Sequence, residues 1–488
     1  MTHAQAPTSP SPELEILMLF TRQDLSALSL TVTIGLTMSP LATRLAHAQL
    51  TPTAPPTSVA PKAAAPAPLP PPISISEQRF RELSTYIKGR GVVDESTRRD
   101  LATLALALDV DISAPTSTLE MVQRLCPARA QVAIWLGDDA AMDAAFTRMQ
   151  SVMPASDAVA LAWTRELITS GQFDRASTLL QSRTFAPERL IDVKIAYALA
   201  LLGLHRFNEA QAAFNEAPAA GRSTAQQSLI SNGSIRLNTL KTMWLRELSA
   251  IAQDQSRGDI PLVELVTSKG SVLIELFEDH APNTVGNFIE HVEAGTYAGT
   301  KFHRRLRGFG VQGGDPATAA GDAGGRSTGG WTVPDELDRV DRRAPLVGRL
   351  VMVKQPAAEA PDSPRLNSAG CQFMFLLTPS EQLDGQYTVF GQVRDGWEVA
   401  RALGNDDEIL SARVVEKRAH DYKGVRLTEE KQGDFSMPRL PGAAAARASE
   451  TRFDPATAPK LVTPTLGANG KQEISVPITP PASAPKKP

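Results

Sequence analysis

The sequence predicts a multidomain protein in which an all-α helical region precedes an antiparallel β domain. From about residue 76 to residue 257, apolar residues recur at helical spacing with few prolines between them, a pattern typical of packed amphipathic helices. From Leu262 onward, apolar residues alternate with polar ones instead, which indicates half-buried strands. Segments rich in Pro and Ala flank both regions. We therefore expect a signal peptide (1–48), a linker (49–75), a helical domain (76–257), a β domain (258–422) and a disordered tail (423–488).

The signal peptide is predicted from an apolar run over residues 25–41 that is followed by Ala46-His47-Ala48. Signal peptidases cleave after such a small-x-small pattern, so we expect cleavage after Ala48 and a periplasmic location. An uncleaved membrane anchor is the alternative, since the run approaches the ~18 apolar residues that a span requires. Membrane contact is expected only through that segment. The true start is left open between Met1 and Met18.

The linker and the tail are too poor in large apolar residues to form a core. The linker contains Pro70-Pro71-Pro72, and the chain after Pro438 is dominated by Ala, Pro, Thr and Lys. Such compositions bury too little apolar surface to offset the entropy of ordering. We expect the linker to be extended and mobile and the tail to be disordered.

Charge and cysteine content exclude several kinds of site. The 488 residues include 50 basic and 53 acidic residues, for a formal net charge of −3, without a run of Lys or Arg, so a nucleic-acid partner is not expected. The two cysteines, Cys126 and Cys371, cannot form a disulfide framework or a cysteine-rich zinc site, and we expect two separate thiols. The seven histidines form no two-His metal motif, and neither a metal nor another cofactor is expected.

Part of the helical region repeats with a period of 34 residues. Phe173 corresponds to Phe207 one period later, and Ala176 corresponds to Ala210. A 34-residue period with an aromatic and a small residue at fixed places resembles tetratricopeptide helical hairpins, in which the small residue lets two helices approach. A copy one period upstream is degenerate, because Met142 stands in place of the small residue. An ordinary helical bundle with a chance spacing is the alternative.

The β domain should begin with a hairpin. Residues 262–267 and 271–276 alternate around the turn Ser268-Lys269-Gly270, as two strands would. A helix is then expected from Pro282, since proline is favoured at the first helical position, to Gly295, a typical helix-ending residue. A second short helix is expected over residues 395–403.

Three later segments carry the most specific pattern in the chain. They read FHRRLRGFGVQGGD at residues 302–315, GCQFMFL at 370–376 and LDGQYTVFGQV at 383–393. In this order and spacing they resemble the signature of cyclophilins, a family of peptidyl-prolyl cis-trans isomerases. The resemblance extends over roughly residues 262–417, and it implies a barrel of eight antiparallel strands closed by two helices.

The resemblance also implies the residues of a prolyl isomerase site. Arg304 stands at the catalytic arginine of the family, and Gln312 at a glutamine that binds the substrate backbone. The walls of the proline pocket and its surroundings correspond to Phe309, Val353, Gln372, Met374, Leu383 and Tyr387. Arg305 and Arg307 have no role in the motif and are expected to be solvated surface charges.

Several positions depart from the family pattern. Met374 replaces the usual Phe of the pocket floor, although Met can still fill that space. Gly310 replaces a Met, which should leave the pocket more open. Val353 and Lys354 replace an Ala-Asn pair, so no Asn side chain can bind the substrate backbone there. These changes suggest weakened or altered catalysis.

We therefore expect a prolyl isomerase that assists the folding of exported proteins, with proline-containing unfolded or partly folded chains as clients. The rival hypothesis is a catalytically weak or inactive peptide-binding module or helical scaffold. Met374, Gly310 and Lys354 favour the rival. Arg304, Phe309 and Gln312 favour catalysis.

Overall fold

The computed structural model describes residues 73–90, 93–322, 327–356 and 364–427, and two short strands beyond them, β10 (Thr465–Leu466) and β11 (Gln472–Glu473). The predicted signal peptide, almost all of the linker and most of the tail lie outside these residues. In the part of the chain so described, no helix is both long and apolar enough to cross a membrane.

The chain divides into two compact units between Trp163 and Thr164, inside helix α7 (Asp157–Thr169). This division differs from the predicted boundary near residue 257. The reason lies in the packing, because a hydrophobic core formed by the helices after α7 also contains Ala344 and Leu346, from a loop of the β region. These helices and the sheet therefore share one unit.

The N-terminal unit consists of helices whose first turns are fixed by side-chain caps. Its helices are α3 (Ile75–Arg90), α4 (Glu95–Ser113), α5 (Leu119–Leu136), α6 (Asp139–Val152) and the beginning of α7. Asp94, Thr118 and Asp138 each accept a hydrogen bond from the backbone N–H three residues later, which satisfies a donor that the first turn leaves unpaired. In the core, Phe146 and Trp163 stack with ring centroids 6.1 Å apart.

The same type of turn occurs three times along the helical region, at intervals of 34 residues. Gly137, Gly171 and His205 have left-handed backbone conformations, with φ of 74°, 77° and 57°. At each turn the following N–H donates to a carbonyl five residues back, over 2.9 Å from Asp138 to Ala133, 2.7 Å from Gln172 to Leu167 and 2.9 Å from Arg206 to Leu201. This pattern ends a helix while pairing its last carbonyls. The local geometry thus follows the 34-residue period of the sequence.

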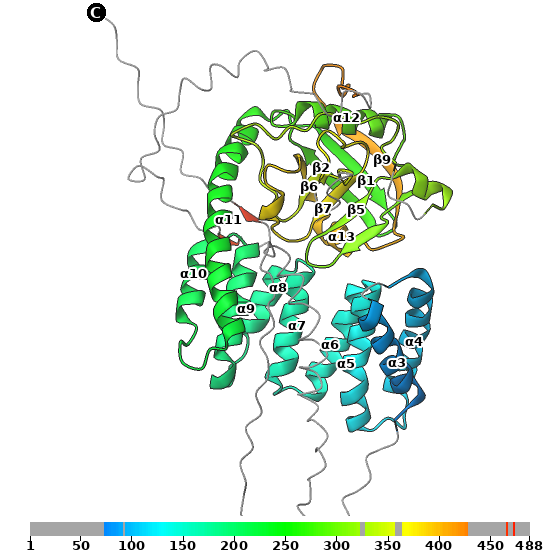
Figure 1. Cartoon of the computed structure of the whole chain (residues 1–488), viewed down its shortest axis with the longest axis vertical. Helices are drawn as coiled ribbons and strands as arrows, with labels where there is room; N and C mark the ends of the chain where they lie inside the picture. Colours follow the sequence, from blue (N-terminus) through cyan, green and yellow to red (C-terminus); the bar gives the residue numbers. More distant parts are fainter. Residues whose placement is uncertain are drawn as a thin grey trace, which may run out of the picture. The chain divides into compact units, whose positions relative to one another are not determined.

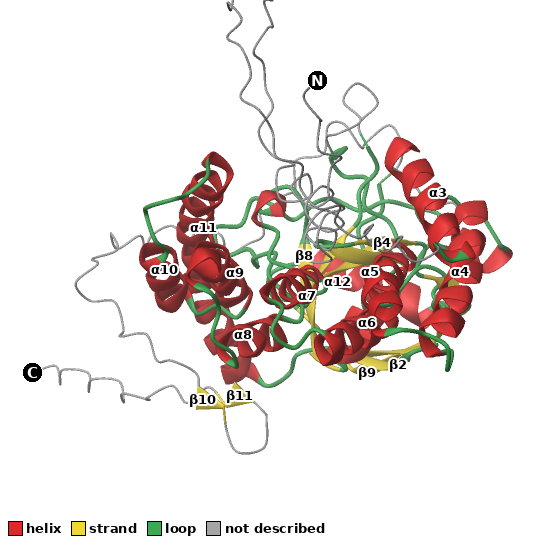
Figure 2. Cartoon of the chain, turned by 90° about the horizontal axis from the view of Figure 1, so that it is seen from below, coloured by secondary structure: helices red, strands yellow, loops and turns green. Residues whose placement is uncertain are grey.

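Four α-helices of the C-terminal unit lie between α7 and the sheet along the chain. They are α8 (Phe173–Gln181), α9 (Leu190–Gly203), α10 (Phe207–Glu216) and α11 (Thr224–Arg257), with the short 3-10 helix η1 (Pro187–Arg189) before α9. Helices α9, α10 and α11 lie side by side in both views (Figures 1 and 2). Helix α11 begins at a capping box between Ser223 and Gln226 and ends at the left-handed Gly258, so its first turn has reciprocal partners. The residues of the repeat pattern, Phe173, Ala176, Phe207 and Ala210, are all buried.

Nine strands of the described chain form one curled antiparallel sheet, in the order β3-β9-β1-β2-β8-β6-β7-β5-β4. They are β1 (Leu262–Thr267), β2 (Gly270–Leu276), β3 (Thr300–Lys301), β4 (Arg304–Leu306), β5 (Gly310–Gly313), β6 (Arg349–Met352), β7 (Phe373–Leu376), β8 (Val389–Asp395) and β9 (Glu408–Glu416). A bridge between Lys301 and Asp315 links β3 to the chain just beyond β5. The count differs from the eight strands expected, because residues 300–306 supply two short strands that pair with different neighbours, β9 and β5.

Helices α12 (Pro282–Glu293) and α13 (Trp397–Ala402) lie at opposite ends of the curled sheet (Figure 1). Both are where the sequence predicts them, and Pro282 opens α12. Inside the sheet, Phe288 of α12 meets Phe373 edge-on, with centroids 5.5 Å apart. The tail was expected to begin at residue 423, but the chain stays packed to residue 427, where Leu427 forms a bridge with Thr332.

Candidate active site

The β4–β5 hairpin brings Arg304 and Gln312 together. The ladder pairs these two residues across the strands, and the turn passes through Gly308, whose left-handed φ of 70° suits glycine. Residues directly opposite in an antiparallel pair lie close enough to interact. Arg304 is exposed, whereas only 5% of Gln312 is exposed. The hairpin therefore presents a cation beside a buried amide.

A second glutamine fixes the amide of Gln312. Gln312 Nε2 donates to Gln372 Oε1 over 2.8 Å. Gln372 Nε2 in turn donates to the Ser327 carbonyl over 2.8 Å and to Asp315 Oδ2 over 3.2 Å. A buried network in which the donors have acceptors holds its side chains in one orientation. The two predicted glutamines thus belong to one network.

Five predicted residues meet in one apolar cluster, which we call the Phe309 cluster. Its buried members are Phe277, Val351, Met374, Leu376, Leu383 and Val389, and its partly buried members are Leu306, Phe309, Val353 and Tyr387. Phe277 and Val351 are members that were not predicted from the sequence. Phe277 directly follows β2, a strand without a site motif, so no sequence signal could have pointed to it.

Met374 fills the space beside Gly310. A Cβ atom on Gly310 would lie 2.7 Å from Met374 Sδ and 2.7 Å from the Phe375 carbonyl oxygen, closer than real side-chain contacts. The expectation that Gly310 leaves the pocket more open is therefore wrong, because a long flexible side chain from the neighbouring strand β7 occupies that volume. The two departures from the family pattern compensate for each other.

Lys354 is buried within an internal ion pair. Its side chain is 1% exposed, and Nζ donates to Asp335 Oδ2 over 2.6 Å and to the Gln386 carbonyl over 3.0 Å. The ammonium also lies 5.7 Å from the ring centroid of Tyr387, within the range of a cation–π interaction. Lys354 therefore holds the chain around Tyr387.

The charge of Arg304 acts on the pKa of Tyr387. Burial raises the pKa of Tyr387 above its usual value; the Arg304 charge acts in the opposite direction, and Asp335 adds to the rise. The phenol is therefore protonated at neutral pH and is able to donate a hydrogen bond. The site combines an exposed positive charge with a neutral donor.

The two other arginines of the hairpin have structural partners. Arg305 donates from Nη1 to the carbonyls of Arg401 and Leu403. Arg307 pairs with the buried carboxylate of Glu166 on α7. The expectation that both are solvated surface charges is wrong, because they bind partners 96 and 141 residues away in the sequence.

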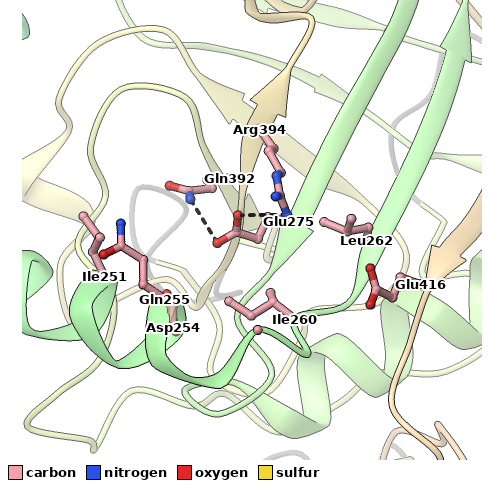
Figure 3. Close-up of a pocket in the computed structure, with 10 residues that line it drawn as sticks. Ile251, Asp254, Gln255, Ile260, Leu262, Glu275, Gln392, Arg394 and Glu416 are labelled. Carbon is pink, nitrogen blue, oxygen red and sulfur yellow. Dashed lines mark hydrogen bonds and ion pairs between the residues drawn. The ribbon is translucent and has the colours of Figure 1, made fainter. Parts of the chain in front are cut away.

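A separate pocket of about 440 Å³ lies between the end of α11 and the sheet (Figure 3). Within it, Glu275 accepts a hydrogen bond from Gln392 over 3.2 Å and faces Arg394 at 4.0 Å. Its lining consists of Ile251, Asp254, Gln255, Gly258, Ile260, Leu262, Glu275, Gln392, Arg394 and Glu416. None of the predicted site residues is among them, so the candidate active site is placed at the Phe309 cluster.

Comparison with known proteins gives matches over the β region. Residues 262–421 match the family model of the cyclophilin type peptidyl-prolyl cis-trans isomerases. The peptidyl-prolyl cis-trans isomerase-like 1 of Rhizopus delemar is 42% identical over 170 residues, which make up 34% of this chain and 96% of that protein. The protein of the same name from Homo sapiens is 41% identical over 144 residues, or 30% of this chain and 80% of that protein.

A solved structure of a cyclophilin type peptidyl-prolyl cis-trans isomerase from Cryptosporidium parvum also matches, with 28% identity and a TM-score of 0.27 over 33% of this chain and 99% of that one. All the predicted site residues lie inside the matched range of the family model, and helices α8 to α11 lie before it.

Proposed function

Because this chain belongs to the cyclophilin-type peptidyl-prolyl cis-trans isomerases, we propose that the Phe309 cluster receives the proline ring of a substrate and that Arg304 is the catalytic residue. One observation carries the proposal: an exposed arginine stands opposite a buried glutamine pair, on the hairpin that supplies Phe309 to an apolar cluster. The other two arginines of that hairpin are occupied by structural partners.

The reaction needs electrostatic stabilisation rather than a change of bonds. Rotation about an X–Pro bond crosses a barrier of about 18–20 kcal/mol, because the peptide C–N bond has partial double-bond character. As the bond twists, the prolyl nitrogen regains its lone pair. A positive donor near that nitrogen stabilises the twisted state more than the planar one, and this differential binding lowers the barrier.

Each group then has a distinct part. Arg304 donates toward the prolyl nitrogen. Phe309, Met374 and Leu383 exclude water from the proline ring, which strengthens the charge interaction beside it. The protonated hydroxyl of Tyr387 donates to the substrate. No proton is transferred, and no covalent intermediate forms.

The experiment that tests this function replaces Arg304 in the full chain. Arg304→Ala should lower kcat/KM for a short prolyl peptide at least ~100-fold, about the loss caused by removing one preorganised donor. The unfolding midpoint should not change, because the residue is exposed. Arg413→Ala is the matched control, since it removes an exposed arginine that pairs with Glu264 between β9 and β1.

Full activity of a folded Arg304→Ala protein would refute the assignment. Binding of prolyl peptides without turnover in the wild type would instead favour the rival hypothesis of a peptide-binding module. Met374 and Lys354, the departures that suggested weak catalysis, both have packed or paired side chains, and this supports a working site.

We further propose that the enzyme acts in the periplasm on proline-containing chains of exported proteins. The supporting pattern, an apolar run followed by Ala46-His47-Ala48, lies outside the described residues. N-terminal sequencing of the mature protein decides the matter: a chain that starts at Gln49 supports export, and one that starts before Leu25 contradicts it.

The helical hairpins are proposed to be tetratricopeptide-like and to bind these clients. The recurrence of one left-handed turn at 34-residue intervals supports this proposal. A second attachment point would raise the local concentration of a client at the isomerase site.

A further inference from the structure

Helix α11 contacts the stretch of chain that carries Leu383 and Tyr387. We call residues 379–387 the wall segment, which includes the 3-10 helix η3 (Glu381–Leu383). Arg236 of α11 donates to the Pro379 carbonyl over 2.6 Å and pairs with Glu381 over 2.7 Å. Helix α11 ends before residue 262, where the match to the family model begins. These contacts therefore come from outside the family domain.

Asp384 is the main attachment point of the wall segment. Arg246 of α11 binds it with 2.8 Å between Nη2 and Oδ1 and 3.4 Å between Nη1 and Oδ2. Arg342 binds the same carboxylate through two hydrogen bonds of 3.0 Å. Paired bonds of this kind fix orientation as well as distance. The side chains of Arg246 and Asp384 are 22% and 13% exposed, so water screens the pair only partly.

A second set of contacts joins α11 to the Phe309 cluster through buried charges. Glu247 Oε2 accepts from Arg343 Nε over 3.0 Å and from Arg349 Nη2 over 2.7 Å, and these three side chains are at most 4% exposed. The guanidinium carbon of Arg343 lies 3.5 Å from the ring centroid of Phe277, a buried member of the cluster. Helix α11 thus reaches both the wall segment and the interior of the site.

A third set of contacts ties α7 to the turn that precedes Phe309. The Thr169 carbonyl accepts from the N–H of Gly308 over 3.0 Å, next to the pair between Arg307 and Glu166. Residues from both helices therefore hold chain segments that carry Phe309, Leu383 and Tyr387.

We propose that α11 is a positioning element of the isomerase site and that Arg246, through Asp384, sets the place of the wall segment relative to Arg304. Arg246 is a positioning residue, since it acts through Asp384 and lies outside the motifs that form the site. The inference rests on the proposed function, because it concerns the same site. Its effect on catalysis follows from geometry, since a displacement of about 1 Å can cost about 100-fold in rate.

The test compares Arg246→Gln with Arg413→Gln in the full chain. Glutamine keeps one amide donor but loses the charge and the planar fork. We expect kcat/KM of Arg246→Gln for a short prolyl peptide to fall about tenfold, mainly through a higher KM. This size of effect is typical of substitutions at residues that act on a site without touching its ligand. Arg413→Gln removes an ion pair with Glu264 and should change neither constant.

Amide hydrogen exchange gives a readout that does not depend on turnover. The N–H groups of Leu383 and Tyr387 donate to carbonyls within the wall segment, over 2.9 Å to Ser380 and 3.1 Å to Leu383. Both amides should exchange faster in Arg246→Gln, because local opening becomes easier, and not in Arg413→Gln. Arg246→Lys should restore part of the lost kcat/KM, since it returns the charge without the fork.

The outcomes separate this inference from the proposed function. Unchanged kinetics and unchanged exchange in Arg246→Gln, together with an active wild type, would overturn the positioning role. A wild type without isomerase activity would overturn the proposed function itself. A raised KM together with faster exchange confined to the wall segment would support both.

Discussion

Glu247→Gln tests how far the C-terminal unit depends on a carboxylate shared between α11 and the sheet. The Glu247 side chain is 0% exposed and accepts hydrogen bonds from Arg343, Arg349 and the backbone N–H of Ala344. Glutamine keeps the shape but is neutral, and half of its amide is a donor that faces other donors. Both guanidinium groups stay charged at any working pH. The substitution therefore leaves excess positive charge in a buried place.

The expected magnitude follows from these contacts. Removing one partner of a buried ion pair costs about 3–5 kcal/mol. Asp254 still binds Arg343, over 2.6 Å, and neutralises part of the excess. We therefore expect Glu247→Gln to lower the free energy of unfolding by about 3 kcal/mol, near the lower end of this range. With a urea m-value of about 3 kcal/mol/M, the unfolding midpoint should fall by about 1 M.

The pH dependence gives a second measure of the same group. Burial raises the pKa of Glu247, but the charges of Arg349 and Arg343 and the hydrogen bond from Ala344 outweigh it, so the folded-state pKa lies below the usual value of 4.5. A carboxyl with a depressed folded-state pKa stabilises the fold above its unfolded-state pKa, and that stability is lost as the pH falls through the folded-state pKa. The wild type should therefore lose stability below pH 4.5 more steeply than Glu247→Gln does.

Urea unfolding of the full chain at pH 7 and at pH 4, followed by tryptophan fluorescence, measures both effects. Glu264→Gln is the matched control, because it makes the same change in a pair with Arg413, whose side chain is 64% exposed. Exposed pairs contribute about 0–1 kcal/mol. If Glu247→Gln lowers the free energy of unfolding no more than Glu264→Gln does, the reasoning is refuted.

Gly310→Ala should destabilise the protein by about 1–3 kcal/mol, the usual cost of overpacking, because the new methyl group meets Met374 Sδ and the Phe375 carbonyl. Adding Met374→Ala should recover only the part of this lost stability that comes from the contact with the sulfur. Thermal unfolding of the variants measures both effects. An unchanged unfolding midpoint in Gly310→Ala would contradict the packing described for this site. Deletion of residues 49–155 should leave the turnover of a short prolyl peptide nearly unchanged, because it keeps α7 whole and removes no residue of the candidate site. The same deletion should slow the proline-limited refolding of a protein client if the helical hairpins bind clients, and equal effects on peptide and protein substrates would argue against client binding.

Local patterns in the sequence predicted the local structure. The hairpin of β1 and β2, the helix that opens at Pro282 and the short helix from Trp397 lie where alternation, proline and spacing indicated them. The predicted site residues come together for a related reason. Their motifs lie on or beside strands that pair with each other, so Gln312 faces Arg304 on one side and Met374 on the other.

Contacts between distant residues were beyond the reach of a single sequence. Arg305 and Arg307 look like ordinary surface charges until the fold supplies their partners. Gly310 alone suggests an open pocket, but the side chain of Met374 on the neighbouring strand β7 fills that space. The packing of the helical region on the β region was out of reach for the same reason, because helical periodicity shows that a face is apolar but does not show what covers it, here Ala344 and Leu346.

Glu247 of α11 binds arginines that come much later in the chain, and this determines when the C-terminal unit can finish folding. When the ribosome has added Glu247, the two arginines that bind it are still 96 and 102 residues from being made. Strand β1 likewise cannot pair with β9 until β9, which begins at Glu408, has been made. The C-terminal unit therefore closes late, after nearly all of its residues have left the ribosome, and its unfinished apolar faces need protection until then. A member of the peptidyl-prolyl cis-trans isomerases thus depends on long-range contacts, which form slowly, for its own folding.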